Sequence, residues 1–328
     1  MSDTKIKKPP VDFTEGRLTG KMIKFALPLM ATALLQSLYN AADMIVVGNF
    51  SKNGNGTFEM GAVGACGPLY SLFMNLFLGL SVGVGICVAQ NIGAKRYEEV
   101  KKFVHTAIIM SVVCGVALGV FGFFSAEWLL KLMDTPEELL PSSTQYMQAM
   151  FVGIPAQILY AFLASALRSS GDSKRPLIFL TISGIANVLI NLVMVMGFGL
   201  GAVGVGIASA VSQYLSVIMI FVFVLRTSGV CRIYLKELRI HKYAIIGIIQ
   251  NGLPTGLQSV VFAVSNVLIQ MSINDFGPEA VSGSGAANNI EGFIYVAMNA
   301  VSAATITVVS QNVGAAKYER IKRVMLVS

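Results

Sequence analysis

Long apolar runs separated by short polar segments dominate the pattern of the chain. A helix that spans a membrane needs about 20 mostly apolar residues. Eight runs reach that length, and a ninth begins near Val324. The pattern therefore predicts an all-α, polytopic membrane fold. The predicted spans are Met22–Asn49, Gly61–Ile92, Phe103–Phe124, Tyr146–Leu167, Leu177–Phe198, Ala202–Leu225, Tyr243–Asn274 and Ala280–Val313.

One stretch of sequence occurs twice. Residues 88–102 read VAQNIGAKRYEEVKK and residues 309–323 read VSQNVGAAKYERIKR, with 8 of 15 aligned positions identical. Each copy ends an apolar run and begins a cluster of cations. Leu27-Pro28 and Leu253-Pro254 likewise open the first and the seventh predicted spans. An internal repeat of this length predicts two similar units of six spans, of which the second is incomplete.

The repeat also predicts how the chain is organised. Six spans are an even number, so both units enter the membrane from the same side, as in a parallel repeat about an axis along the membrane normal. A complete second unit would need about 120 more residues, by extension of the repeat. We therefore expect a chain that is truncated at its C-terminus. The expected parts are a polar tail (1–21), a first six-helix bundle (22–226), a linker (227–242) and a partial second bundle (243–328).

The positive charges are distributed unevenly over the predicted loops. Of 24 Lys and Arg residues, 22 lie before or at the start of the first span or follow an even-numbered one, and only Lys52 and Lys131 lie in the other loops. The positive-inside rule predicts a cytosolic N-terminus in the cell membrane, which we take to be a bacterial cytoplasmic membrane. This asymmetry also accounts for the net charge of +7. We therefore expect the lipid bilayer as partner, no nucleic acid, and a monomer.

The loop at Asp134–Glu138 lies between the third and fourth predicted spans and reads DTPEE. Thr135 is suited to cap a helix, and Pro136 to occupy its first position. Two acids follow in what would be the first turn. The pattern predicts that an interfacial helix begins here and leads into the fourth span.

Two carboxylates lie well inside predicted spans. Asp43 occurs in YNAADMIVVG of the first span and Glu291 in NNIEGF of the eighth, and no Lys or Arg lies at comparable depth. A charge at the middle of a bilayer costs about 2.5–3.5 kcal/mol on insertion scales, so it is rarely accidental. Such a carboxylate can bind and release a proton, or bind Na⁺ when ionised. The structural alternative is a carboxyl group that holds helices together through hydrogen bonds to Tyr39, Asn40 or a neighbouring helix.

Amide side chains occur at similar depths. Asn40 precedes Asp43 by three residues and Asn288 precedes Glu291 by three, so each pair shares a helix face. Such amides either join helices or bind substrate. The candidate coupling residues are Asp43 and Glu291, and the candidate cavity residues are Gln36, Tyr39, Asn40, Asn187, Asn191 and Asn288.

The sequence contains none of the common catalytic motifs that we sought. It has no GxxxxGK[ST] phosphate loop, no HExxH and no GxSxG. None of its four cysteines lies in a CxxC or Cys/His cluster that would predict a metal site. We therefore expect a protein that is not an enzyme and needs no cofactor, with H⁺ or Na⁺ as a coupling ion.

Four motifs carry a resemblance to a known family. They are YNAADMIVVG in the first span, VAQNIGAKRYEEVKK after the second, MDTPEEL in the following loop, and LRSSGDSKRP at residues 167–176. With these motifs the chain resembles the multidrug and toxic compound extrusion (MATE) family. The resemblance implies two six-helix bundles around a central cavity, and export of cationic, amphipathic compounds in exchange for H⁺ or Na⁺.

The resemblance also implies roles for three residues. Asp43 matches the aspartate of the family's first helix, and Glu291 resembles an acid in the eighth helix of some bacterial members. Many members carry a second aspartate in the fifth helix, where this chain has Asn191 in NVLINL. A mechanism with two acids in the first bundle is therefore not expected here.

Three hypotheses for function follow. The first is an antiporter for cationic drugs and metabolites that works through Asp43. The second is a flippase for lipid-linked sugars of the same superfamily, which would need Arg or Lys for a pyrophosphate head group. No cation lies deep in a predicted span, which counts against it. The third is a truncated fragment that does not transport.

Overall fold

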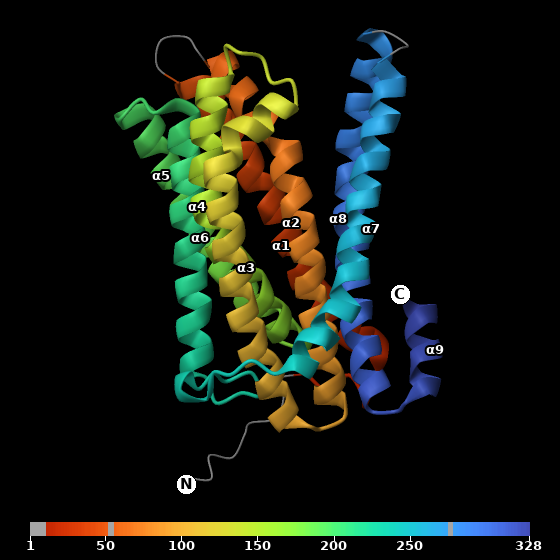
Figure 1. Ribbon diagram of the computed structural model, residues 1–328. Coiled ribbons are helices and arrows are strands. Elements are labelled where there is room, and N and C mark those ends of the chain that lie inside the picture. The colour runs from red at the N-terminus through yellow and green to blue at the C-terminus, as the bar shows by residue number, and fades with distance from the viewer. Residues whose placement is uncertain (1–10, 52–55, 275–277) are drawn as a thin grey trace.

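The computed structural model describes residues 11–51, 56–274 and 278–328, and these contain helices and turns but no strand (Figure 1). Within these residues, eight helices are long and apolar enough to cross a membrane. The prediction of an all-α, polytopic membrane fold is therefore confirmed. The helices are α1 (Leu18–Phe50), α2 (Gly56–Gly93), α3 (Tyr97–Leu132), α4 (Leu140–Ser169), α5 (Lys174–Leu192), α6 (Gly201–Arg226), α7 (Lys242–Asn274), α8 (Pro278–Gly314) and α9 (Tyr318–Val327), with a π-helix η2 (Val193–Gly197) and a 3-10 turn η3 (Leu235–Glu237).

Several helices extend beyond the apolar runs that predicted them. Helix α3 begins at Tyr97, ahead of the predicted start at Phe103. Its first turns carry ion pairs between residues three apart, Glu98–Lys101 at 2.8 Å and Glu99–Lys102 at 2.7 Å. Such pairs stabilise a helix outside the apolar core of a membrane. Hydrophobicity therefore locates the spans but not the ends of the helices.

The predicted start of a helix at Thr135 is wrong. Helix α4 begins at Leu140, and Pro141 occupies its first turn. Asp134 adopts a positive φ of 53°, and the backbone N–H of Thr135 donates to the carbonyl of Leu130. The DTPEE motif therefore belongs to the turn that reverses the chain after α3, and Pro141 has the position that suits a proline.

The two ends of the molecule differ in composition. We define the basic end as residues 11–17, 94–96, 170–173, 227–241 and 315–317, which connect the helices on the side of the N-terminus (bottom of Figure 1). Residues 133–139 and 198–200 lie at the opposite end. Helices α1 and α7 both begin at the basic end, as a parallel repeat requires. The four boundaries assigned to the parts of the chain stay predictions.

Helices α7 and α8 run beside the bundle formed by α1 to α6. They meet it at the basic end and diverge from it towards the opposite end (Figure 1). Helix α7 packs against α2 through glycines, because a side chain at Gly83 would collide with the backbone of Gly252. Absence of side chains at such positions lets two helices approach closely. Helix α8 packs against α1 and α2.

Candidate functional site

A cavity of about 640 Å³ lies within the first bundle. Helices α1, α2, α4, α5 and α6 form its walls. Three methionines and four tyrosines contribute much of the apolar surface. Five of the predicted site residues line the cavity, namely Gln36, Tyr39, Asn40, Asp43 and Asn187.

Asp43 is held by neutral hydrogen-bond donors. The side-chain amide of Asn191 donates to Asp43 Oδ1, and the hydroxyl of Ser209 also bonds the carboxyl group. Asn191 is fully buried behind the cavity wall. Among the described residues, the salt bridges do not include Asp43. In the described structure the partners of this carboxyl group are therefore dipoles and not a cation.

The two asparagines of α5 form one connected network with Asp43. Asn191 Nδ2 donates to Asn187 Oδ1 at 3.2 Å, and Asn187 Nδ2 donates to Ser209 Oγ at 3.4 Å. Asn187 is 5% exposed. Within the described part of the chain, the side-chain oxygen Oδ1 of Asn191 is buried without a hydrogen-bond partner. The network therefore offers an unused acceptor beside the carboxylate.

Helix α5 changes its hydrogen-bonding pattern directly after this network. Residues Val193–Gly197 form the π-helix η2, a geometry that is frequent at functional sites. Val195 is fully buried there and packs with Val46, Val47 and Val205. This apolar cluster fixes the segment of α1 that follows Asp43. The sequence contains no proline or other signal that predicts the π-helix.

A second polar cluster joins three helices in the same cavity. The hydroxyl of Tyr70 in α2 donates to Gln157 Oε1 in α4, and Gln213 in α6 also bonds that hydroxyl. All three residues line the cavity. The sequence analysis missed them, together with Ser209. Glutamine in an apolar run is the signal that could have found Gln157 and Gln213.

Two candidates of the eighth predicted span remain. Glu291 is an exposed residue of α8 and does not line the cavity. The side chain of Asn288 lies outside the described residues. The proposed roles of both residues stay predictions.

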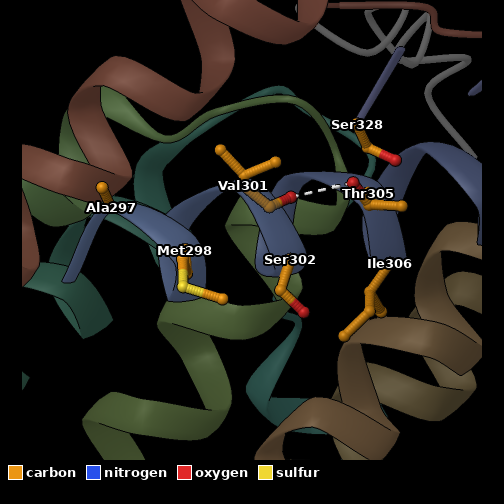
Figure 2. Close-up of a pocket in the computed structure, with 7 residues that line it drawn as sticks. All are labelled: Ala297, Met298, Val301, Ser302, Thr305, Ile306 and Ser328. Atoms are coloured by element: carbon orange, nitrogen blue, oxygen red, sulfur yellow. Dashed lines mark hydrogen bonds between the residues drawn. The ribbon is translucent and has the colours of Figure 1, made fainter. Parts of the chain in front are cut away.

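A smaller cavity of about 470 Å³ lies along α8 (Figure 2). Its wall carries hydroxyl groups but no titratable side chain. The hydroxyl of Thr305 donates to the carbonyl of Val301 at 2.9 Å, within the helix itself. This cavity therefore offers no chemistry comparable to that of Asp43. It is lined by Ala297, Met298, Val301, Ser302, Thr305, Ile306 and Ser328.

Comparison with known proteins shows what the chain is similar to. The MatE family model matches residues 28–193 and 254–328. The probable multidrug resistance protein YoeA of Bacillus subtilis is 27% identical over 320 residues, which cover 93% of this chain and 67% of YoeA. The probable multidrug resistance protein YpnP of the same organism is 26% identical over 310 residues, with 94% of this chain and 68% of YpnP covered.

A solved structure has the same fold. It is described as the outward-facing conformation of a multidrug resistance MATE family transporter of the MOP superfamily. The TM-score is 0.89 at 21% sequence identity, and the match covers 98% of this chain and 71% of that chain. The chain spans about two thirds of the length of YoeA and YpnP, and it shares the fold of the solved structure over the part that is matched.

Proposed function

The chain belongs to the MatE family, and on that premise we propose that it exports small cationic, amphipathic compounds in exchange for H⁺ or Na⁺. In this proposal the basic end faces the cytosol, in accordance with the positive-inside rule. The names of YoeA and YpnP as probable multidrug resistance proteins support drug export. The observation that carries the proposal is the Asp43 carboxylate, which faces a cavity and has only neutral hydrogen-bond partners among the described residues.

The cavity wall favours a cation as the substrate. None of the described residues that line it is Lys or Arg. A carboxylate removed from water without a counterion is costly, so a substrate cation that approaches Asp43 is attracted strongly. The tyrosine rings and the methionine side chains of the wall suit the apolar part of such a compound. The same lack of cations disfavours a lipid-linked pyrophosphate as substrate.

The substrate cation and the H⁺ or Na⁺ would be coupled because both compete for the Asp43 carboxylate. Binding of a proton or of Na⁺ at Asp43 cancels the charge that attracts the substrate cation. Oxygen atoms of Asn187, Asn191 and Ser209 lie in the same network and are ligands that a hard cation prefers. Substrate and coupling ion would therefore occupy the cavity alternately, as exchange across a membrane requires.

The proposal is tested by ion-driven export of ethidium in everted membrane vesicles. Asp43→Asn preserves the size of the side chain but removes the charge, and we expect ion-driven export to be lost. Glu127→Gln is the matched control, because this exposed carboxylate of α3 pairs only with Lys131 in the described structure. Normal export by Asp43→Asn would remove Asp43 from the mechanism.

A further inference from the structure

A short segment before α1 is anchored to the far part of the chain. We call residues 11–16 the strap. Phe13 is fully buried and packs edge-on against Phe25, with ring centroids 5.2 Å apart. Lys21 of α1 donates to the carbonyls of Asp12 at 2.6 Å and Glu15 at 2.7 Å. The strap is therefore fixed to the beginning of the helix that carries Asp43.

The strap is bound by the second copy of the repeated motif. The backbone N–H of Phe13 donates to Gln311 Oε1 at 3.2 Å, and its carbonyl accepts from Asn312 Nδ2 at 3.3 Å. Lys317 donates to the carbonyl of Thr14 at 2.9 Å. Arg320 donates to the carbonyls of Phe13 at 3.3 Å and Gly16 at 3.0 Å. All four motif residues thus form hydrogen bonds to the backbone of the strap.

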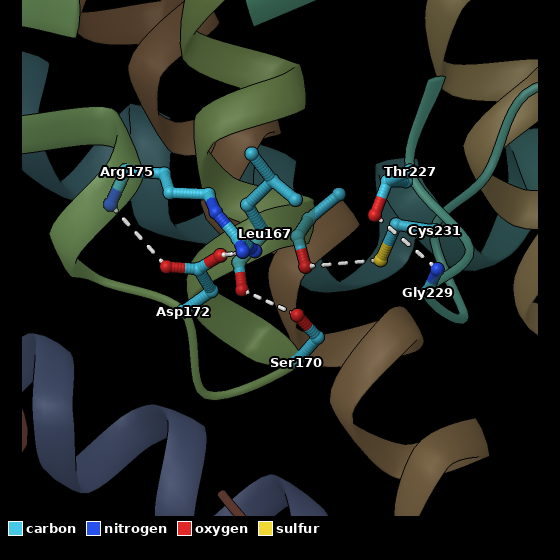
Figure 3. A network of polar contacts seen from close by, with 8 residues as sticks. Leu167, Ser170, Asp172, Arg175, Thr227, Gly229 and Cys231 are labelled. Carbon is cyan, nitrogen blue, oxygen red and sulfur yellow. Dashed lines mark hydrogen bonds and ion pairs between the residues drawn. The ribbon is translucent and has the colours of Figure 1, made fainter. Parts of the chain in front are cut away.

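The LRSSGDSKRP motif completes this binding site from the first bundle. Gln311 Nε2 donates to the carbonyl of Ser169 at 2.8 Å. Val11 of the strap lies against Gly171, whose φ of +88° and lack of a side chain permit the approach. Asp172 stabilises the turn by pairing with Arg175 at 2.6 Å (Figure 3). Gln311 therefore connects the strap and the first bundle at one point.

The two copies of the repeated motif also pack against each other. A side chain at Gly93, the last residue of α2, would collide with the carbonyl of Gln311. A side chain at Gly314, the last residue of α8, would collide with the carbonyl of Gln90. The contact is reciprocal, as expected for repeats related by a two-fold axis. It joins the two halves of the molecule at the basic end.

The segment before α7 is bound by the first bundle, just as the strap before α1 is bound by the second copy of the repeated motif. The backbone N–H of His241 donates to Thr106 Oγ1 of α3 at 3.2 Å. The backbone N–H of Tyr234 donates to His105 Nε2 at 3.2 Å. In the first turn of α7, the hydroxyl of Tyr243 donates to Glu99 of α3 at 2.7 Å. Each segment that precedes a repeat is thus bound by the other repeat.

We propose that the strap is a latch that keeps the basic end closed. The closed end is where α7 and α8 meet the first bundle (Figure 1). Opening it would separate α8 from α2 and remove Gln311, Asn312 and Arg320 from the strap. Release of the strap would also free the start of α1, to which Lys21 ties it. The latch, which rests on the proposed transport function, therefore links closure of the basic end to the helix of Asp43.

The test measures distances between nitroxide spin labels in the purified protein in lipid nanodiscs. One pair of labels is placed at Arg96→Cys and Arg323→Cys, which are exposed on either side of the basic end. A second pair, at Lys131→Cys and Ile269→Cys, reports on the opposite end. Three native cysteines are buried, and Cys114→Ser removes the partly exposed one. No substrate or ion is needed, so the result is independent of whether export is observed.

The variants Phe13→Ala and Asn312→Leu each weaken the latch. We expect a second, longer distance at the basic end together with a shorter one at the opposite end. Phe13→Leu, which retains most of the packing, should give a smaller fraction of the long distance and serves if Phe13→Ala does not fold. Lys322→Ala is the control, since this exposed residue of α9 pairs only with Glu319 in the described structure. Unchanged distances in the latch variants, or lengthening at both ends, would overturn the proposal.

Discussion

The glycines at the reciprocal crossing allow a sharp prediction. Gly314→Ala would place a Cβ atom 2.6 Å from the carbonyl carbon of Gln90 and 2.8 Å from its Cα atom, closer than real Cβ atoms approach backbone. Neither partner is a flexible side chain, so α8 and α2 must separate. Gly292 lies in the same helix, and an added Cβ there would have no described atom within 4 Å apart from its chain neighbours and the backbone of its own helix. Gly292→Ala is therefore the matched control.

The expected magnitudes follow from two opposing effects. Replacing a helical glycine by alanine favours the helix by up to about 1 kcal/mol, and Gly292→Ala should show this gain. Overpacking typically lowers the free energy of unfolding by about 1–3 kcal/mol. Gly314→Ala should therefore be less stable than the wild-type protein by this cost minus the gain in helix stability. Gly93→Ala should behave like Gly314→Ala because its partner is the carbonyl of Gln311. The double variant should cost less than the sum, since the first separation makes room for the second methyl group.

Thermal unfolding followed by circular dichroism at the helix band measures these differences. Gly314→Ala should lower the unfolding temperature relative to the wild-type protein, and Gly292→Ala should not. The spin-label distance at the basic end should increase in Gly314→Ala and in Gly93→Ala, but not in Gly292→Ala. The reasoning is refuted if Gly314→Ala unfolds at the same temperature as Gly292→Ala. It is also refuted if the loss of stability in the double variant equals the sum of the losses in Gly93→Ala and Gly314→Ala.

Two further predictions concern the cavity and the strap. Asn191→Leu removes the amide that donates a hydrogen bond to Asp43, and it should reduce ion-driven export, since a hydrogen bond to a charged group is worth about 1.5–3 kcal/mol. Asn75→Leu is the control, because this amide lines the same cavity without bonding Asp43, and the variant should export normally. Equal losses of export in the two variants would contradict the role of Asn191. Burial raises the pKa of the Asp12 carboxyl, but the two hydrogen bonds from Thr14 and the positive charges of Lys21 and Lys317 together outweigh it, so the pKa lies below its usual value. A group with a lowered folded-state pKa stabilises the fold above its unfolded pKa and loses that effect as pH falls. We therefore expect the basic end to loosen only below about pH 4, as measured by the spin-label distance, and Asp12→Asn to abolish this dependence.

The cavity was only partly predictable from the sequence. Asp43, Asn40 and Asn187 stand out because charged and amide side chains are costly within apolar spans. Tyr70 and Ser209 do not stand out, because hydroxyl-bearing residues also occur where helices pack. Which face of its helix each of them occupies depends on the neighbouring helices. The error at Thr135 has a similar origin, because the end of α3 determines the turn that follows.

The sequence by itself determined the number and order of the spans, the repeated motif and the carboxylate within the first span, because hydrophobicity and local repetition are properties of neighbouring residues. Only the tertiary structure decided what the repeated motif contacts. Phe13 and Gln311 are 298 residues apart, and Gly93 meets Gln311 only when two helices cross. The sequence shows that the motif is repeated. Packing across the chain decides which of its residues touch, because that depends on the relative placement of whole helices.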